Sequence, residues 1–161
     1  MGGTFSAVIP TAVPLDETWL PDMFGWLTDP EVNHLAHVGE VTKDGQRHWY
    51  DSLATRDDYW VRGIVADDGT RLGAFGMKHI DAYSGEVFTY IGPASARGAG
   101  IGRWSMLCCE DEARRRRLVR VWAIVAEYNA VSQKMLTGLG YDAVGPHEDW
   151  GVFFEKLVPG R

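Results

Sequence analysis

Three alternate glycines, Gly98, Gly100 and Gly102, are the feature of this sequence that points most directly to chemistry. They fall where a predicted strand ends and a predicted helix begins, so backbone N–H groups can converge there without Cβ atoms in the way, and such an arrangement binds phosphate. The spacing excludes two common nucleotide motifs, because GxGxxG would require glycine at Arg103 and GxxxxGK[ST] matches nothing in the chain. From these residues alone, a flexible glycine connector without a ligand is the alternative.

The elements on either side of the glycines predict a strand–helix–strand crossover. A strand is expected over residues 86–91, and a helix runs from about Gly102 to Arg117, where four arginines suit the negative end of the helix dipole. Residues 118–126 are nearly all apolar and rich in β-formers, which predicts a central strand covered on both faces. The glycine turn therefore lies between a strand and a helix N-terminus.

The rest of the chain is read from its turn and capping residues. Residues 59–66 and 72–80 flank Asp67-Asp68-Gly69-Thr70, a composition that predicts a hairpin. The other expected elements are a strand over 4–13, a helical stretch over 15–27 interrupted at Pro21, a helix begun by Asp29-Pro30, a helix over 43–54 behind Thr42, a helix over 129–137, and closing strands over 141–144 and 151–157. This order predicts an α/β (α+β) fold with one mixed sheet, and 161 residues predict a single domain, 1–161.

Charge and composition narrow the classes of partner. The net charge is −6, with 13 acidic and 6 basic residues in 1–85 but 9 acidic and 10 basic residues in 86–161. The first half can attract a cationic amine and the second a polyanionic ligand, although uneven surface charge explains the division equally well. A nucleic-acid binder is disfavoured, no apolar run reaches the length of a membrane span, and the first ten residues lack the pattern of a secretory signal.

Cysteine and histidine usage predicts neither a disulfide framework nor a metal site. The two cysteines, Cys108 and Cys109, are adjacent and have no partner elsewhere in the sequence, which fits a reducing compartment and a cytoplasmic protein. The five histidines show no metal-binding spacing. A covalent acyl-cysteine mechanism is disfavoured because no histidine accompanies the pair, so we expect both thiols to pack in the core.

The segment around the glycines resembles the GNAT superfamily of acetyltransferases. Arg97-Gly98-Ala99-Gly100-Ile101-Gly102 matches the family pattern [QR]xxGx[GA], and TYIGP at 89–93 resembles the end of its splayed fourth strand. Asn129, Ser132 and the Leu139-Gly140-Tyr141 ending resemble its NxxSxxxYxxxGF helix. The resemblance is specific over 71–158 and looser before. It implies a single mixed, mostly antiparallel, twisted sheet flanked by helices, with splayed parallel central strands.

The resemblance also implies the cofactor, acetyl-coenzyme A, and the residues that hold it. The strand end meets the pantetheine arm and the thioester, the glycine loop wraps the pyrophosphate, and the following helix completes the site. The implied cofactor-binding residues are Ile91, Gly92, Arg97, Gly98, Ala99, Gly100, Ile101, Gly102, Arg103, Asn129 and Ser132.

The chemistry implied by the family is direct attack of an amine on the thioester in a ternary complex, with strand N–H groups stabilising the oxyanion. An alkylammonium must first lose a proton, and Glu86 is the leading candidate to accept it. Thr89 and Tyr90 point to opposite faces of the strand, so one of them can contact the amine or a relay water. The family tyrosine that protonates the departing thiolate is replaced here by Leu136, which leaves Tyr128, Tyr141 or solvent as donor.

The acceptor is predicted to be a small primary amine. WLTDPEVN at 26–33 and HWYDSL at 48–53 resemble the GNAT branch with ribosomal-protein N-terminal and nucleotide-linked amino-sugar acetyltransferases. Aromatic residues in the predicted cleft helices favour an amino sugar, because they can stack on a sugar or base. A protein N-terminus comes second and an aminoglycoside third, and the resemblance leaves room for a homodimer. The alternative of another class is a sensor that binds acetyl-CoA without turnover.

Overall fold

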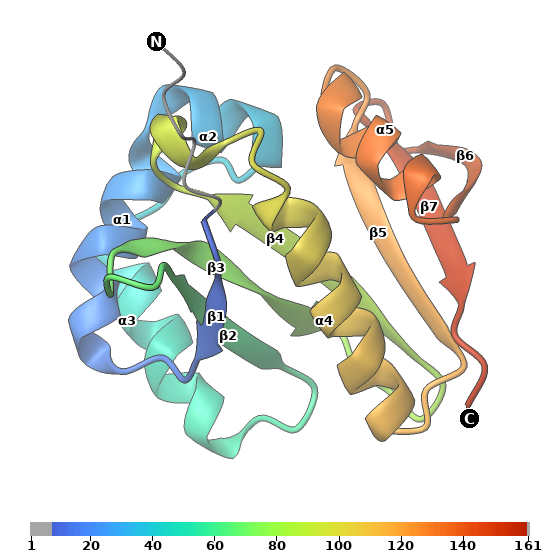
Figure 1. Cartoon of the computed structure of the whole chain (residues 1–161), viewed down its shortest axis with the longest axis horizontal. Coiled ribbons are helices and arrows are strands. Elements are labelled where there is room, and N and C mark those ends of the chain that lie inside the picture. The colour runs from blue at the N-terminus through green and yellow to red at the C-terminus, as the bar shows by residue number, and fades with distance from the viewer. Residues whose placement is uncertain (1–7, 161) are drawn as a thin grey trace, which may run out of the picture.

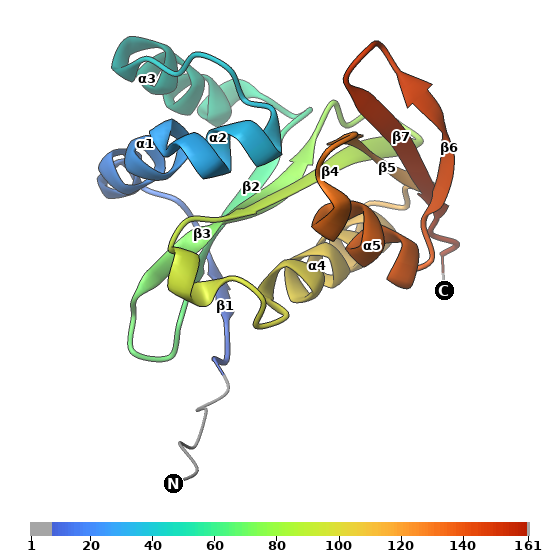
Figure 2. The same cartoon turned by 90° about the horizontal axis from the view of Figure 1, so that it is seen from above.

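The computed structural model describes residues 8–160, which form one seven-stranded mixed sheet with helices on both faces (Figures 1 and 2). The strands are β1 (Thr11–Val13), β2 (Trp60–Val65), β3 (Arg71–Lys78), β4 (Ser84–Ile91), β5 (Arg120–Ala126), β6 (Asp142–His147) and β7 (Gly151–Leu157). The helices are α1 (Leu20–Thr28), α2 (Pro30–Ala36), α3 (Lys43–Ser52), α4 (Ile101–Arg115) and α5 (Ala130–Gly138), with 3-10 turns at Glu17–Trp19, Leu53–Thr55 and Ala94–Ala96.

The sheet order is β1-β2-β3-β4-β5-β7-β6, and every neighbouring pair is antiparallel except β4 and β5. The predicted α/β fold with one mixed, mostly antiparallel sheet is therefore confirmed. Figure 2 shows α1, α2 and α3 on one side of the sheet and α4 and α5 on the other. The sheet thus separates two apolar layers.

Local signals position most of these elements as predicted. Asp29 Oδ1 accepts hydrogen bonds from the N–H groups of Glu31 (2.9 Å) and Val32 (3.2 Å), which caps α2. Thr42 Oγ1 caps α3 through the N–H of Gly45 at 3.0 Å. Gly69, at φ +86°, closes the β2–β3 hairpin. Of the strand predicted over 4–13, residues 11–13 form β1, residues 8–10 are not in a strand, and residues 4–7 lie outside the described residues.

Three details differ from the sequence predictions. Pro21 lies in the first turn of α1, where its missing N–H costs no hydrogen bond, so it begins the helix and does not interrupt it. The helix α4 ends at Arg115, and Arg117 at φ +63° turns the chain toward β5. In β5 the side chains of Val121, Ala123 and Val125 are buried and those between them are half-buried, so the strand is fully covered on one face only.

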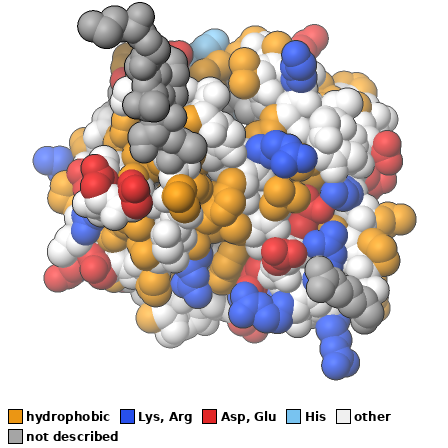
Figure 3. Space-filling view, in the orientation of Figure 1, with side chains coloured by type: hydrophobic (Ala, Val, Ile, Leu, Met, Phe, Trp, Pro, Cys, Tyr) orange, Lys and Arg blue, Asp and Glu red, His pale blue; other side chains and the backbone are white. Residues whose placement is uncertain are grey.

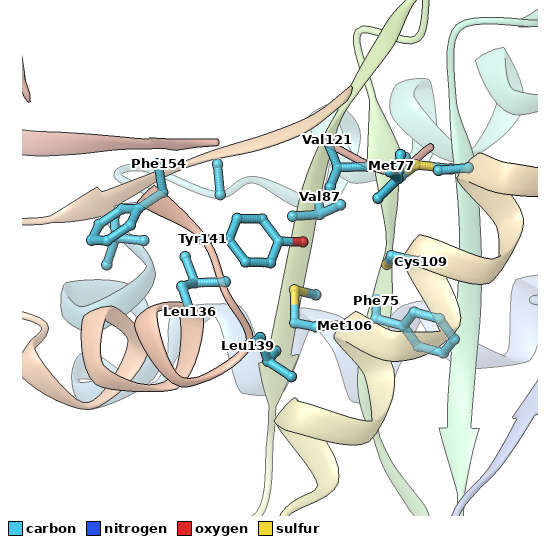
Figure 4. Packing of buried hydrophobic residues seen from close by; sticks show 14 of the residues in the cluster. Phe75, Met77, Val87, Met106, Cys109, Val121, Leu136, Leu139, Tyr141 and Phe154 are labelled. Carbon is cyan, nitrogen blue, oxygen red and sulfur yellow. The ribbon is translucent and has the colours of Figure 1, made fainter. Parts of the chain in front are cut away.

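The larger core lies between the sheet and α4. It contains Phe75, Met77, Met106, Val121, Tyr141 and Phe154, several of which Figure 4 shows packed around the Tyr141 ring. The smaller core, on the α1–α3 side, gathers Trp19, Met23, Val61 and Ala74. Burial of each large apolar side chain stabilises the fold by roughly 1.5–3 kcal/mol, and here it also fixes the two layers relative to the sheet.

The arginine run at the end of α4 is a solvated helix end, seen among the basic side chains at the lower right of Figure 3. Arg114 pairs with Asp111 (3.3 Å), and Arg116 pairs with Glu112 (2.8 Å), as does Arg115. These arginines pair with acids of their own helix, as a solvated face does.

Candidate functional site

The central opening of the sheet lies between β4 and β5. These strands pair in parallel only from Ser84–Glu86 to Arg120–Trp122, and then diverge, as Figure 1 shows. The Gly92 N–H donates to the Leu72 carbonyl at 2.8 Å, toward β3. Because successive N–H groups of a strand point to opposite edges, the N–H groups of Thr89 and Ile91 face the opening. Within residues 8–160, the facing edges of β4 and β5 beyond this point have no strand partner, and their backbone polar groups face the opening.

A cavity of about 350 Å³ fills this opening. Its walls come from both layers, with residues of α1, α2, α3 and β2 on one side and of α4, β5 and α5 on the other. The lining includes Gln46, Trp49, Tyr59, Lys78, Phe88, Thr89, Tyr90, Asn129, Ser132 and Leu136. A concave, mostly apolar cavity with few convergent polar groups is the usual form of a small-molecule site.

The glycine loop leads into the N-terminus of α4. Gly98 (φ +79°) and Gly100 (φ +80°) adopt the left-handed conformation, and a Cβ at either would meet no atom of the described chain within 4 Å. Within residues 8–160, the N–H groups of residues 98–103 have no backbone acceptor. Open space, free donors and the positive helix end together fit a pyrophosphate.

Other residues of the predicted loop contribute in different ways. Ile101 is 2% exposed and anchors the loop in the core, so it offers only its backbone to a ligand, while Ala99 and Arg103 are exposed beside the glycines. A Cβ at Gly102 would lie 3.3 Å from Met135 Sδ, so this glycine lets α4 pack against α5.

Arg97 binds protein groups in this structure. Its Nη2 and Nε donate to the carbonyls of Gly92 (2.8 Å) and Ile91 (3.3 Å), and its Nη1 pairs with Glu31 at 3.0 Å. The side chain predicted to contact the cofactor thus ties the loop to the end of β4 and to α2. A Cβ at Gly92 would lie 2.3 Å from the Trp26 ring, so Trp26 of α1 packs closely against the end of β4.

Asn129 and Ser132 lie where α5 begins. Asn129 Oδ1 accepts a hydrogen bond from the Ser132 N–H at 3.2 Å and caps α5, while Asn129 Nδ2 donates to the Leu35 carbonyl at 3.0 Å. This asparagine therefore joins the two walls of the opening across the cavity.

Thr89 and Tyr90 face different layers, which the sequence left open. The Ser105 hydroxyl donates to Thr89 Oγ1 at 2.8 Å, so Thr89 faces α4. Tyr90 packs edge-to-face on Trp26 at 6.4 Å, on the α1–α3 side. Burial, and secondarily the neighbouring Tyr59, raises the pKa of Tyr90, so its hydroxyl stays protonated. Both side chains line the cavity.

Glu86 lies at the vertex of the opening and is 9% exposed. Its Oε2 lies 2.6 Å from His79 Nδ1, its Oε1 lies 3.9 Å from Lys78 Nζ, and the His79 ring stacks on Trp122. Glu86 shares the face of Phe88 and Tyr90, but it does not line the cavity. The sequence analysis missed His79 and Lys78, which only the β3–β4 register, Lys78 opposite Glu86, could have indicated.

The position of the family tyrosine is apolar here, since Leu136 is 2% exposed and lines the cavity. Of the suggested substitutes, Tyr141 packs in the core beside Leu136 (Figure 4), where burial raises its pKa. The Tyr128 hydroxyl donates to the His34 carbonyl at 2.7 Å. Neither tyrosine belongs to the cavity lining.

The cysteines are placed as packing residues. Cys109 is fully buried and its thiol donates to the Gly76 carbonyl at 3.3 Å, while burial raises the pKa of both thiols. A thiol that stays protonated in the core is a poor nucleophile.

Metal ligand sets and membrane-crossing helices are both absent from residues 8–160. Among residues 8–160, no three His, Cys, Asp or Glu side chains come together as a metal ligand set. No helix in the same range combines the length and apolarity of a membrane crossing.

Comparisons with solved structures show the same fold. A domain from Methanocaldococcus jannaschii is 15% identical with a TM-score of 0.83, over 93% of this chain and 99% of that one. A spermidine N-acetyltransferase from Vibrio cholerae, in complex with CoA and spermine, is 14% identical with a TM-score of 0.81, over 95% and 96%. The ribosomal-protein-S18-alanine N-acetyltransferase from Escherichia coli is 15% identical with a TM-score of 0.67, over 95% and 96%.

Sequence comparison identifies the family. Among curated proteins, no sequence is significantly similar to this chain. A family model described as an acetyltransferase (GNAT) domain matches residues 11–142, which is most of the chain. The chain therefore belongs to the GNAT acetyltransferases, and it is an N-acetyltransferase whose cofactor is acetyl-CoA.

Proposed function

We propose that this enzyme transfers an acetyl group to a small primary amine by direct attack in a ternary complex. The observation that carries the proposal is the opening between β4 and β5, where unpaired N–H groups face a cavity that both layers line. Bound acetyl-CoA supplies the acetyl group as an activated thioester. Cys109 is fully buried and Cys108 half-buried, and burial raises the pKa of both thiols, which supports attack by the amine itself without an acyl-enzyme.

On the cofactor wall, we assign binding to the backbone. The N–H groups of residues 98–103 and the N-terminus of α4 suit the pyrophosphate, and Arg97 holds the loop against β4. Asn129 and Ser132 line the cavity and would hold the arm of the cofactor there. The N–H groups of Thr89 and Ile91 suit an acyl oxygen that gains negative charge during attack.

Proton transfer is assigned to Glu86, the one carboxylate of β4. Because Glu86 does not line the cavity, we propose that it takes the proton of the amine through water, with His79 holding the carboxylate in place. The Tyr90 hydroxyl, which lies on the same face of β4, contacts the acceptor. Solvent reprotonates the thiolate, since Leu136 cannot.

The acceptor candidates share a primary amine. The sequence resemblance ranks a nucleotide-linked amino sugar first among them, followed by a protein N-terminus and an aminoglycoside. The structural neighbours named above add spermidine and the alanine of ribosomal protein S18.

A second function, an acetyl-CoA sensor without turnover, is favoured by Leu136 at the position of the family tyrosine. The test is calorimetric titration with acetyl-CoA, followed by free-thiol release in the same preparation with a panel of amines. We expect binding and acceptor-dependent release. Binding without release from any amine would support the sensor, and absence of binding would contradict both functions.

A further inference from the structure

We call the side of the cavity that α1, α2, α3, β2 and β4 line the acceptor wall, and this wall carries almost no charge. Of the side chains that line the cavity, Lys78 alone is ionic, and within residues 8–160 no aspartate or glutamate lines it. Three acids of the α1–α3 layer pair with arginines outside the cavity: Glu17 with Arg47, Asp22 with Arg71, and Glu31 with Arg97. The acidic balance of the first half therefore does not produce an acidic cleft.

A polycation is a poor fit for such a wall. Each extra ammonium group would lose its hydration without gaining a carboxylate partner, and Lys78 would repel it. The single amine that reacts must be neutral when it attacks, so one amine is tolerated where several are not.

Aromatic rings form much of the acceptor wall. Trp49 packs edge-to-face on Tyr59 at 5.8 Å, and Tyr59 lies 5.9 Å from Phe88. Tyr90 continues this aromatic wall along β4. Flat apolar rings held in fixed orientations favour an aromatic acceptor body, which can stack or pack edge-on against them.

Two buried polar atoms point to a hydrogen-bonding group on the acceptor. The side-chain amide nitrogen of Gln46 and the hydroxyl of Tyr90 are inaccessible to solvent, and neither has a hydrogen-bond partner within residues 8–160. Both residues line the cavity. A buried polar group without a partner is costly, and a ligand that supplies an oxygen removes this cost.

The volume of the cavity limits the size of the acceptor. The cavity measures about 350 Å³ and must also take the acetyl end of the cofactor. At the end of α2, His34 stacks on Tyr128 at 4.1 Å and His37 stacks on Trp150 at 3.8 Å, which joins the two walls. A nucleotide-linked sugar is too large for this space, and one lysine is a weak site for its diphosphate.

We propose that the acceptor is a small arylalkylamine with a single amino group and one hydroxyl or carbonyl substituent, which hydrogen-bonds to Gln46 and Tyr90. This inference rests on the proposed transferase function and specifies its substrate class. The reaction forms the amide N–C bond and breaks the C–S bond, with the amine proton leaving to water and the thiolate leaving as free coenzyme A.

The test measures thiol release from acetyl-CoA with tyramine, phenethylamine, spermidine, kanamycin, a UDP-linked amino sugar and an alanine-starting peptide. We expect kcat/KM for tyramine to exceed that for spermidine by at least about 100-fold, and that for phenethylamine by about tenfold, the factor that one hydrogen bond of about 1.4 kcal/mol supplies.

Variants test the polar contact. Tyr90→Phe and Gln46→Leu should each reduce the tyramine-to-phenethylamine ratio toward one, while the matched Tyr83→Phe, at a side chain that is 70% exposed outside the cavity, should leave it unchanged. Thermal unfolding checks that each variant is folded. If one cavity variant does not fold, the other alone tests the polar contact.

The outcomes separate the two proposals. A preference for spermidine, kanamycin, the sugar nucleotide or the peptide would overturn the acceptor class and leave the transferase function standing. A tyramine-to-phenethylamine ratio unchanged in both cavity variants would overturn the polar contact. Binding of acetyl-CoA without release from any amine would overturn the transferase function and the inference with it.

Discussion

The two walls of the opening between β4 and β5 are built in different ways. The cofactor wall, which we propose binds acetyl-CoA, is mostly backbone, with the glycine loop, the first turn of α4 and the edge of β4. The acceptor wall, which we propose binds the amine, is mostly side chains, contributed by α1, α2, α3, β2 and β4. A backbone wall binds the same phosphate groups whatever the acceptor is, whereas a side-chain wall can change its substrate by exchange of a few residues. The comparison therefore assigns chemistry common to the family to one wall and specificity to the other.

The largest expected effect comes from the backbone wall. Gly100→Glu places a carboxylate beside the predicted pyrophosphate site and a side chain at φ +80°, so calorimetry should detect no acetyl-CoA binding. Gly69→Glu is the matched control, because Gly69 has φ +86° and equally open surroundings in a distant hairpin. Normal affinity in Gly100→Glu, or equal loss in Gly69→Glu, would refute the loop assignment.

The ion pair between Glu110 of α4 and Lys156 of β7 should stabilise the fold without contributing to acetyl-CoA binding. Glu110 is 1% exposed and lies 2.5 Å from Nζ of Lys156, whose side chain is 23% exposed. Glu110→Ala leaves this cation without its partner and should lower the free energy of unfolding by about 3–5 kcal/mol, measured by urea denaturation. Affinity of the folded variant for acetyl-CoA should be unchanged.

The exposed neighbour is the control for that experiment. Asp111 is 75% exposed in its pair with Arg114, so Asp111→Ala should change stability by less than about 0.5 kcal/mol. Equal effects of the two substitutions would show that the buried pair does not anchor α4.

At Glu86, where β4 and β5 begin to diverge, we expect a substitution to change turnover but not acetyl-CoA binding. Glu86→Gln removes the proposed proton acceptor but keeps the side-chain size, and kcat should fall about 100-fold with acetyl-CoA affinity unchanged. Glu155→Gln, in an ion pair with Arg120 at 3.0 Å outside the cavity, should leave kcat unchanged. An unaltered kcat in Glu86→Gln would mean that solvent alone takes the proton.

The contrast between a wall of backbone and a wall of side chains also explains which features the sequence could predict. The Asp29 and Thr42 caps, the Gly69 turn and the glycine loop before α4 each depend on residues close together in the chain, and the structure has all of them. Backbone geometry at such points is specified by a few local side chains. The fold and the conformation of the glycine loop could therefore be predicted from the sequence.

The acceptor wall did not follow from the sequence, because its geometry depends on packing between distant elements. Gln46 and Tyr90 come from α3 and β4, and nothing in either segment shows that both line one cavity. The contact between His79 and Glu86 requires the β3–β4 register. The full cover predicted for β5 was wrong because apolar composition cannot show that a strand diverges from its neighbour and borders a cavity.

The smallest effect is expected at the turn that sets this register. Asp81 Oδ1 accepts hydrogen bonds from the N–H groups of Tyr83 (2.7 Å) and Ser84 (2.8 Å), and these bonds lower the pKa of Asp81 below its ordinary 3.8. A carboxyl whose pKa is lower in the folded state stabilises the fold above pH 3.8, and this stabilisation is lost as the pH falls through the folded value. Asp81→Asn should therefore have a slightly lower melting temperature than the parent at neutral pH.

That difference should close as the pH is lowered below 3.8 and stay closed in more acidic buffer. Asp67→Asn, at an exposed turn residue of the β2–β3 hairpin, is the control and should melt at about the temperature of the parent at neutral pH. If the gap in Asp81→Asn persists in acid, the hydrogen bonds to Tyr83 and Ser84 do not depend on the charge of Asp81. If kcat falls along with the melting temperature, the turn also positions Glu86 at the vertex, and the two walls are coupled through the register of β4.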